Sequence, residues 1–162
     1  MYQWLVYLHL IGVFGFLLAH GASASVAFRL RTERNAARIS ALLDLSSSSL
    51  SIMYGSILLL LVSGVIAGFL GNWWGRGWIW TAIGLLIAIL VAMFFMGTTY
   101  YNTVRKAVGL PYFDGKKAQP AGEPASSEEL ARVLEAGNPA RLAVIGGGGL
   151  MVLLLLMVFK PF

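Results

Sequence analysis

The chain has 162 residues, of which 58% are hydrophobic and only 12% are charged, with a mean hydropathy of +0.77 and a formal charge of +5. Soluble domains carry about 25% charged residues, so this composition excludes an ordinary soluble protein and indicates one integral membrane domain. Cysteine is absent, which excludes disulfides, iron–sulfur clusters and thiolate metal sites.

The first apolar run, about residues 2–28, contains both histidines of the sequence, His9 and His20. It is longer than the ~20 residues that cross a bilayer. The histidines are eleven residues apart, so on a helix both imidazoles lie within roughly 20° of one face and about 16 Å apart along the axis. No basic residue precedes the run, which predicts an uncleaved span with its N-terminus outside. An ionisable residue inside a span is a functional-site hypothesis.

The segment after this run, residues 29–44, contains four arginines and two acidic residues. It predicts a cytoplasmic loop or an amphipathic helix at the level of the lipid headgroups. We expect the second span at about 47–70, with Asp44 and the serines that follow it capping the start. Small residues such as Gly64 and Gly68 lie along one stripe of this span, which predicts close packing with another helix.

A glycine-rich turn, residues 71–80, holds four of the five tryptophans and predicts an interfacial hairpin. The third span is expected at about 78–101. Met93 and Met96 lie toward its end. Methionine sulfur can ligate a soft metal or haem iron, and it also serves as a flexible packing group, so both interpretations stay open.

The only sizeable aqueous segment is the loop at 102–138. Ser126 and Glu129 form the pattern of a capping box, which predicts a short helix in the second half of this loop. Gly137 is a residue type that ends helices, and Asn138 with the proline after it is typical of a new helix start.

The fourth span is expected at about 140–159 and contains the four glycines 146–149, which predict close helix approach. The two loops contain nine of the twelve basic residues and all seven acidic ones; Arg141 follows the second loop by three residues, and Arg76 and Lys160 lie elsewhere. The positive-inside rule therefore predicts both loops in the cytoplasm and both termini outside, in a bacterial cytoplasmic (inner) membrane. The basic charge reflects this topology and indicates no nucleic-acid partner. The predicted fold is an all-α bundle of four transmembrane helices surrounded by the lipid bilayer.

The middle of each span lacks Asp, Glu, Lys and Arg, which argues against a proton-coupled transporter or an ion channel. The histidines remain. A neutral imidazole can ligate copper, zinc or the iron of haem b, so His9 and His20 are the predicted cofactor or metal ligands. The other spans have no histidine. An opposite axial ligand would come from the same histidine of a second copy in a homodimer or from a methionine (Met53, Met93 or Met96), or the iron would be five-coordinate.

Three features of the first 105 residues resemble a family of four-span bacterial membrane proteins of unassigned function: Leu-His-Leu-Ile-Gly at 8–12, the arginine-rich first loop, and Gly-Trp-Ile-Trp at 77–80. More distantly, the chain is similar to the copper-resistance D proteins and the HemJ-type protoporphyrinogen oxidases, which share a histidine in the first span. This resemblance implies that His9 corresponds to their haem-associated histidine. The third span lacks their basic residue, so the resemblance implies haem or metal binding rather than oxidase activity.

Two functions follow from the sequence. The first is a haem- or metal-binding membrane protein, in electron transfer or tetrapyrrole handling, with His9 and His20 as ligands. The second is a non-enzymatic accessory subunit of a larger membrane complex, in which each histidine donates a hydrogen bond to a neighbouring helix. Whether the protein is an enzyme stays open.

Overall fold

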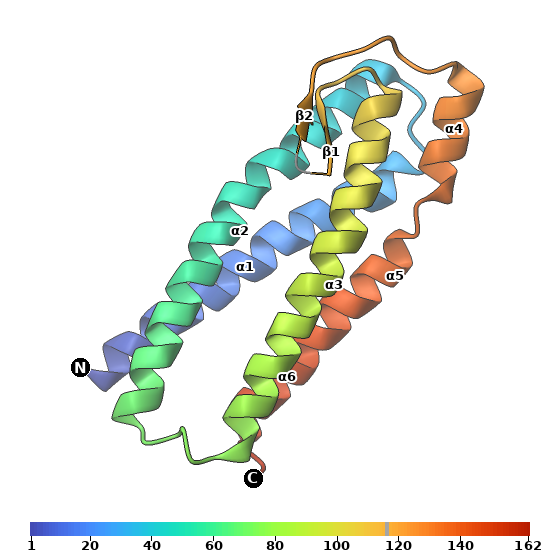
Figure 1. The fold of residues 1–162 in the computed structure, drawn as a ribbon. Helices are drawn as coiled ribbons and strands as arrows, with labels where there is room; N and C mark the ends of the chain where they lie inside the picture. Colours follow the sequence, from blue (N-terminus) through green and yellow to red (C-terminus); the bar gives the residue numbers. More distant parts are fainter. Residues whose placement is uncertain (116) are drawn as a thin grey trace.

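The computed structural model describes residues 1–115 and 117–162. Within them, four helical stretches are long and apolar enough to cross a membrane: α1 (Tyr2–Leu30), α2 (Ala36–Leu70), α3 (Gly77–Ala107) and the stretch Ser127–Phe159. The last stretch comprises α4 (Ser127–Ala136), α5 (Pro139–Ala143), the π-helical turn η1 (Val144–Gly148) and α6 (Gly149–Phe159). Figure 1 shows an elongated bundle in which α1 runs beside α2, and α3 runs beside α5 and α6. The predicted all-α, four-span fold is confirmed.

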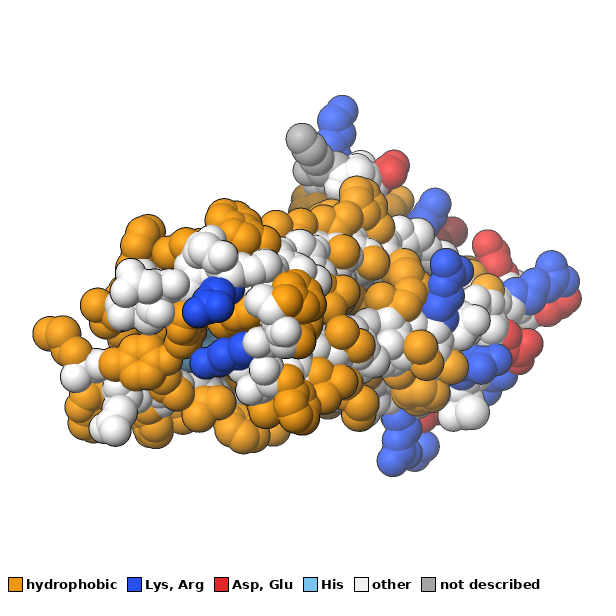
Figure 2. All heavy atoms as spheres, turned by 90° about the horizontal axis from the view of Figure 1, so that it is seen from below, with side chains coloured by type: hydrophobic (Ala, Val, Ile, Leu, Met, Phe, Trp, Pro, Cys, Tyr) orange, Lys and Arg blue, Asp and Glu red, His pale blue; other side chains and the backbone are white. Residues whose placement is uncertain are grey.

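The outside of the bundle is apolar. Large side chains on three different spans, Leu18, Phe95 and Val158, are between 65% and 74% exposed. Figure 2 shows apolar side chains along the length of the molecule, with acidic and most basic side chains gathered at one end. A surface of this kind is stable only against lipid hydrocarbon, because exposed apolar patches of this extent are rare in soluble proteins. The chain is therefore a multi-pass membrane protein in contact with the bilayer.

Two apolar clusters form the interior. The cluster in the middle of the bundle joins α1, α3 and α6 through Phe16, Ala82, Ile89, Leu150 and Leu153. The cluster at the charged end joins α1, α2, α3 and α4 through Val26, Leu30, Ile39, Leu43, Val104 and Leu134. The second cluster positions the short helix α4 over the end of the bundle.

The second span begins earlier than predicted. α2 starts at Ala36, where the side chain of Asn35 accepts a hydrogen bond from the Arg38 backbone N–H, so Asp44 and the serines lie inside the helix and do not cap it. The headgroup-level segment that the arginines suggested is thus the first part of α2. The helix continues through it because Ile39 and Leu43, one turn apart, are both buried in the end cluster.

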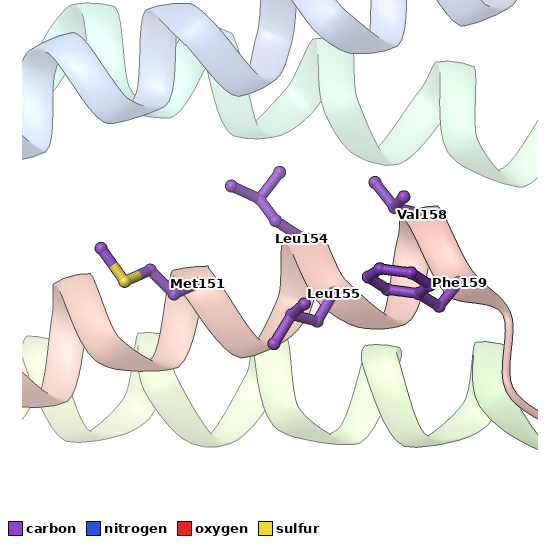
Figure 3. Close-up of a pocket in the computed structure, with 5 residues that line it drawn as sticks. All are labelled: Met151, Leu154, Leu155, Val158 and Phe159. Atoms are coloured by element: carbon purple, nitrogen blue, oxygen red, sulfur yellow. The ribbon is translucent and has the colours of Figure 1, made fainter.

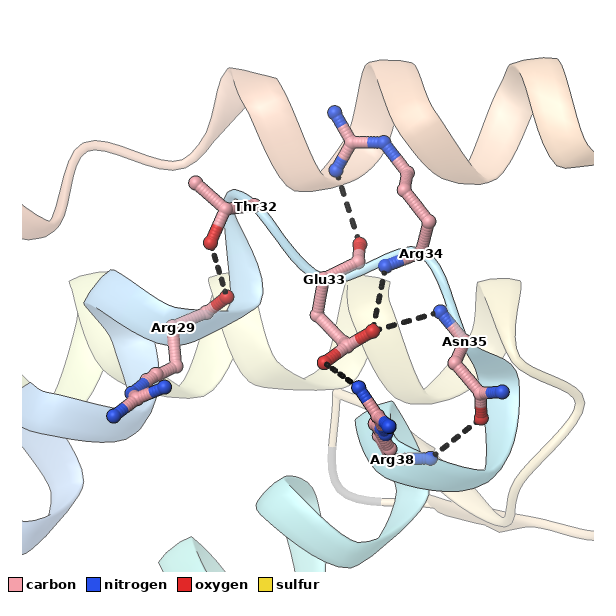
Figure 4. Close-up of polar contacts among 6 residues, drawn as sticks. All are labelled: Arg29, Thr32, Glu33, Arg34, Asn35 and Arg38. Atoms are coloured by element: carbon pink, nitrogen blue, oxygen red, sulfur yellow. Dashed lines mark hydrogen bonds and ion pairs between the residues drawn. The ribbon is translucent and has the colours of Figure 1, made fainter.

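The turn between α1 and α2 is organised by Glu33 (Figure 4). Its carboxylate accepts hydrogen bonds from the backbone N–H groups of Arg34 and Asn35, each at 3.0 Å, and lies 4.0 Å from the guanidinium of Arg38. The Asn35 and Arg34 backbone donors, ahead of the nearby arginines, lower the pKa of the Glu33 carboxyl. Arg34 also donates to Glu135 on α4 at 2.7 Å, which ties this turn to the short helix.

The backbones of α1 and α2 approach each other closely at Gly12. A Cβ atom added there would lie 2.9 Å from the Leu60 backbone nitrogen and 3.0 Å from the Ser56 carbonyl oxygen. Backbone atoms inside a helix cannot move aside as a flexible side chain does. Gly12 is therefore a contact that admits no side chain, and it fixes how α1 crosses α2.

The tryptophan turn closes the opposite end. Trp73 and Trp78 pack against each other with ring centroids 5.6 Å apart, and the ammonium of Lys160 lies 4.4 Å from the Trp73 ring centroid. The Trp78 backbone N–H donates to the Phe162 carbonyl at 3.2 Å. These contacts join the turn to the residues that follow α6, and the cation–π contact keeps the lysine at the membrane boundary.

The long loop contains the predicted short helix and one element that was not predicted. Ser126 caps α4 by accepting from the Glu129 N–H, and Asn138 caps α5 by accepting from the Arg141 N–H, as expected. The additional element is an antiparallel hairpin of β1 (Tyr112–Asp114) and β2 (Lys117–Gln119).

We predict opposite effects for two glycine substitutions in α1. Gly12→Ala places a methyl group against the α2 backbone and should destabilise the protein by about 1–3 kcal/mol, the usual cost of overpacking. Gly21→Ala is the matched control, because nothing lies within 4 Å of the added Cβ. It should be neutral or stabilising by up to ~1 kcal/mol through helix propensity. Unfolding of both variants in the same detergent compares them, and equal stabilities would contradict the contact.

We also predict a pH-dependent effect at Glu33. A carboxyl whose pKa is lowered by folding stabilises the folded state above its ordinary pKa, and this stabilisation is lost as the pH falls through the lowered value. Glu33→Gln should therefore lower the thermal midpoint at neutral pH and have little effect in strong acid. Glu128→Gln, which removes an exposed pair with Arg132, is the control and should change little at either pH. A Glu33→Gln effect that persists unchanged in strong acid would contradict this explanation.

Candidate functional site

His9 lies in the contact between α1 and α2. Its Nδ1 is 3.0 Å from the Leu60 carbonyl oxygen and 3.3 Å from Ser63 Oγ. A carbonyl only accepts, so Nδ1 carries the proton and Nε2 keeps the free lone pair. The ring also contacts α2 where Gly64 provides space, because a Cβ there would lie 3.0 Å from His9 Cε1. The sequence-based alternative of a hydrogen bond to a neighbouring helix therefore describes what His9 does.

His20 lies in a different environment, although it is on the same helix. Its ring stacks on Phe16 one turn earlier, with centroids 6.1 Å apart and planes 9° apart. On the other side it meets Gly146 in η1, where a Cβ atom would lie 2.5 Å from both Cε1 and Nε2 of the imidazole. The described residues provide no hydrogen-bond partner for this ring. Both ring nitrogens of His20 are thus uncommitted within the described part of the chain.

Met93 reaches the same point from α3. Its sulfur lies 3.4 Å from the position that a Cβ would take on Gly146, the position that also lies 2.5 Å from His20 Nε2. The distance between His20 Nε2 and the Met93 sulfur therefore cannot exceed the sum of 2.5 Å and 3.4 Å. An imidazole from the first span and a thioether from the third meet at a glycine of the fourth. We call these three residues the His20–Met93–Gly146 contact.

The backbone at this contact is unusual. Residues Val144–Gly148 form a π-helical turn between α5 and α6. Single π turns occur frequently at functional sites, and the glycines make the irregularity easier because they restrict the backbone least. The glycine run was predicted to permit close approach of helices, and it accommodates side chains: the His20 ring at Gly146 and Ile89 at Gly149.

A polar cluster lies next to His20 toward the charged end. Ser23 Oγ is 3.0 Å from Ser46 Oγ on α2 and 3.2 Å from the Tyr101 hydroxyl on α3, and that hydroxyl donates to the Ser23 carbonyl at 2.7 Å. Hydrogen bonds of this kind between spans contribute about 0.6 kcal/mol each. Since Ser23 follows His20 by three residues, the cluster sets the rotation of α1 that directs His20 toward α3 and η1.

The other predicted residues are not brought to this contact. Met96 lines a separate groove between α3 and α4–α5, described below. Met53 packs at the edge of the central apolar cluster. His9 and His20 contact different helices and do not share a centre. No group of three or more His, Asp or Glu side chains in the described residues could hold a metal ion.

A further pocket on α6 offers no chemistry. It has a volume of about 360 Å³ and is lined by apolar side chains that Figure 3 labels: Met151, Leu154, Leu155, Val158 and Phe159. All five come from one helix, and most are strongly exposed. We assign this face to the surrounding lipid.

The donor set suits a bare ion better than a macrocycle. Imidazole nitrogen and thioether sulfur are neutral, and sulfur donors select soft ions such as copper(I). A haem coordinated by both would place its plane between His20 and Met93, where both side chains already contact Gly146. The spans would have to separate to admit the ring, so a haem does not fit the contact as it stands in one chain.

Parts of this site were beyond sequence reasoning. The sequence indicates Met93 as a possible ligand but does not show that His20 lies opposite it. It also does not identify Ser63 as a hydrogen-bond partner of His9. The signal for both was the presence of small residues on the partner helices, because a side chain that lies on a helix backbone requires a glycine beneath it. A small residue shows where a helix leaves room for a neighbouring side chain, but it does not show which side chain occupies that room.

We predict that adjacent glycines in η1 respond differently to the same substitution. Gly146→Ala brings a methyl group onto the His20 ring and should destabilise the protein by about 1–3 kcal/mol. Gly147→Ala is the control, since nothing lies within 4 Å of its Cβ. In a double-mutant cycle, His20→Ala should remove most of the penalty of Gly146→Ala, because it vacates the space that the methyl group needs. Additive effects of the two substitutions on unfolding would contradict the contact.

Comparison with protein-family models, with curated proteins and with solved structures finds no match for this chain. The function of the site has to be inferred from this chain's own residues.

Proposed function

We propose that this is a bacterial inner-membrane protein that binds a soft transition-metal ion within the bilayer, with His20 and Met93 as ligands. One observation supports the proposal above the others: the two donors come from different spans and approach the same glycine in a π-helical turn. Copper(I) is the ion whose preferences match a neutral imidazole and a thioether.

The apolar surroundings favour a monovalent ion. All seven acidic residues lie outside the middle of the spans, so the site offers no carboxylate to balance a divalent charge. Burying an unbalanced charge is costly, and the cost is lower for one unit of charge than for two. Copper(I) therefore fits the electrostatics as well as the donor set.

Haem b is the second candidate, in electron transfer or tetrapyrrole handling. It would require α3 and α5–α6 to separate around His20, or a homodimer in which the same histidine of two copies provides both axial ligands. His9 retains a free Nε2 lone pair while its Nδ1–H donates to the Leu60 carbonyl, and a histidine that ligates a metal is usually oriented by such a hydrogen bond from its other ring nitrogen. His9 is therefore the residue through which a dimeric haem site would form.

We also propose an orientation of the protein in the membrane. Most basic residues lie at the end formed by α4, the hairpin and the first turn, so the positive-inside rule places that end in the cytoplasm. Both termini and the tryptophan turn then lie outside. In this orientation His20 is in the cytoplasmic half of the bilayer and His9 in the outer half.

The competing function is a non-enzymatic accessory subunit of a larger membrane complex. The hydrogen bond of His9 to Leu60 favours it, because this histidine already has a structural role. His20 discriminates between the two functions, since the described residues give it no such partner.

We predict that the purified protein from copper- and haem-replete cells contains a metal that His20→Ala removes. Met93→Leu keeps the volume and removes the preferred donor, so it should weaken metal binding by about 10–100-fold. Metal analysis, copper(I) titration and oxidised and reduced absorption spectra measure this. A Soret band would identify haem, and copper without a Soret band would identify the ion site.

Met96→Leu and His9→Ala are the matched controls. Both alter a predicted ligand outside the His20–Met93–Gly146 contact, so metal content should stay near that of the wild type. Loss of metal in His9→Ala alone would assign the site to the first histidine and contradict this proposal. A colourless, metal-free protein that does not bind added copper(I) would support the accessory-subunit function.

A further inference from the structure

A groove lies between α3 and the α4–α5 segment, near the charged end of the bundle. Its volume is about 530 Å³. From α3 it is lined by Phe95, Met96, Thr99, Tyr100 and Thr103, and Arg141 of α5 lines its opposite wall. The groove is open to the outside of the bundle and is separate from the His20–Met93–Gly146 contact.

The lining changes from apolar to polar along its length. Phe95 and Met96 lie deepest in the span, and Thr103 is two turns nearer to the charged end, about 12 Å from Phe95 along the helix. The hydroxyls of Thr99 and Thr103 donate to carbonyls of their own helix, one turn back. The polarity of the groove therefore changes in the same direction as that of a phospholipid: its apolar part lies at membrane depth and its polar part lies nearer the membrane interface.

Arg141 provides a positive charge on the wall of the groove opposite α3. Four other arginines form ion pairs with acidic side chains: Arg34, Arg38, Arg105 and Arg132. Among the described residues no carboxylate pairs with Arg141. The nearby acidic residue of α4, Glu135, is paired with Arg34 at 2.7 Å. The guanidinium is thus available for an anion, and a guanidinium can bind phosphate oxygens bidentately.

Tyr100 also lines the groove, through its ring. The ring lies on Gly137, which joins α4 to α5, since a Cβ added there would meet Tyr100 Cε2. The Tyr100 hydroxyl is buried beneath this linker and is not accessible from the groove, so Tyr100 contributes apolar contact area there.

We propose that this groove binds an anionic phospholipid. One acyl chain lies along Phe95 and Met96, and the phosphate binds the guanidinium of Arg141. Basic pockets between spans recognise anionic headgroups in this way. An acyl chain alone would give no selectivity, because the whole bilayer offers the same contact. Arg141 is therefore the residue that determines which lipid is bound.

Titration of the detergent-purified protein with phosphatidylglycerol and with phosphatidylcholine of identical acyl chains, followed by native mass spectrometry, tests the proposal. The wild type should prefer phosphatidylglycerol by about fivefold, as one basic group near a membrane surface contributes ~1 kcal/mol. Arg141→Gln should remove this preference. The Asn138 cap of α5 uses the Arg141 backbone, so the variant keeps its helix start.

Arg132→Gln is the matched control, because it removes an arginine of α4 outside the groove and should preserve the preference. An equal loss of preference in Arg132→Gln and Arg141→Gln would overturn the proposal, as would equal binding of the two lipids by the wild type. Displacement of phosphatidylglycerol by millimolar inorganic phosphate would also overturn it, because it would indicate a simple anion site.

Discussion

Aromatic and imidazole rings lying directly on glycine backbone are the contact on which the arrangement of this bundle depends. In lipid there is no hydrophobic force that drives one apolar helix toward another, so close packing and interhelical hydrogen bonds decide which faces meet. A ring on a glycine gains many dispersion contacts with the exposed backbone at once. In the described part of the chain this contact occurs five times between different elements: His9 on Gly64, His20 on Gly146, Trp74 on Gly68, Tyr100 on Gly137 and Phe162 on Gly77.

Both histidines lie on a glycine, but their other neighbours differ, so their roles differ. His9 combines its glycine with an acceptor, the Leu60 carbonyl, so the ring is held in one orientation and one tautomer. The His20 ring lies on Gly146 and stacks on Phe16. The sulfur of Met93 on α3 lies near the same glycine. Two residues of the same type on one helix face thus differ because the helices opposite them differ.

The sequence predicted the number of spans and the caps of α4 and α5 well, since long apolar runs and cap patterns such as Ser126 to Glu129 are local signals. The start of α2 was predicted too late, because the arginines suggested a surface while Ile39 and Leu43 are buried against the end cluster. The meeting of His20 and Met93 could not be predicted. A span is apolar on all sides, so its hydrophobic pattern does not specify the rotation about its axis, and partners more than 70 residues apart leave no local signal. The groove at Arg141 was missed for the same reason.

The length of α2 has a consequence for the membranes in which the protein can reside. Its 35 residues extend for about 52 Å, whereas the hydrocarbon core of a bilayer is about 30 Å thick. The surplus lies at the charged end, where Ile39 and Leu43 are covered by α1, α3 and α4 rather than by lipid. A thicker or thinner bilayer therefore moves its surface along a segment in which Ile39 and Leu43 are already covered by protein, although Leu45 of the same segment is 53% exposed. The protein is suited to bilayers of varying thickness without a change in how its spans pack.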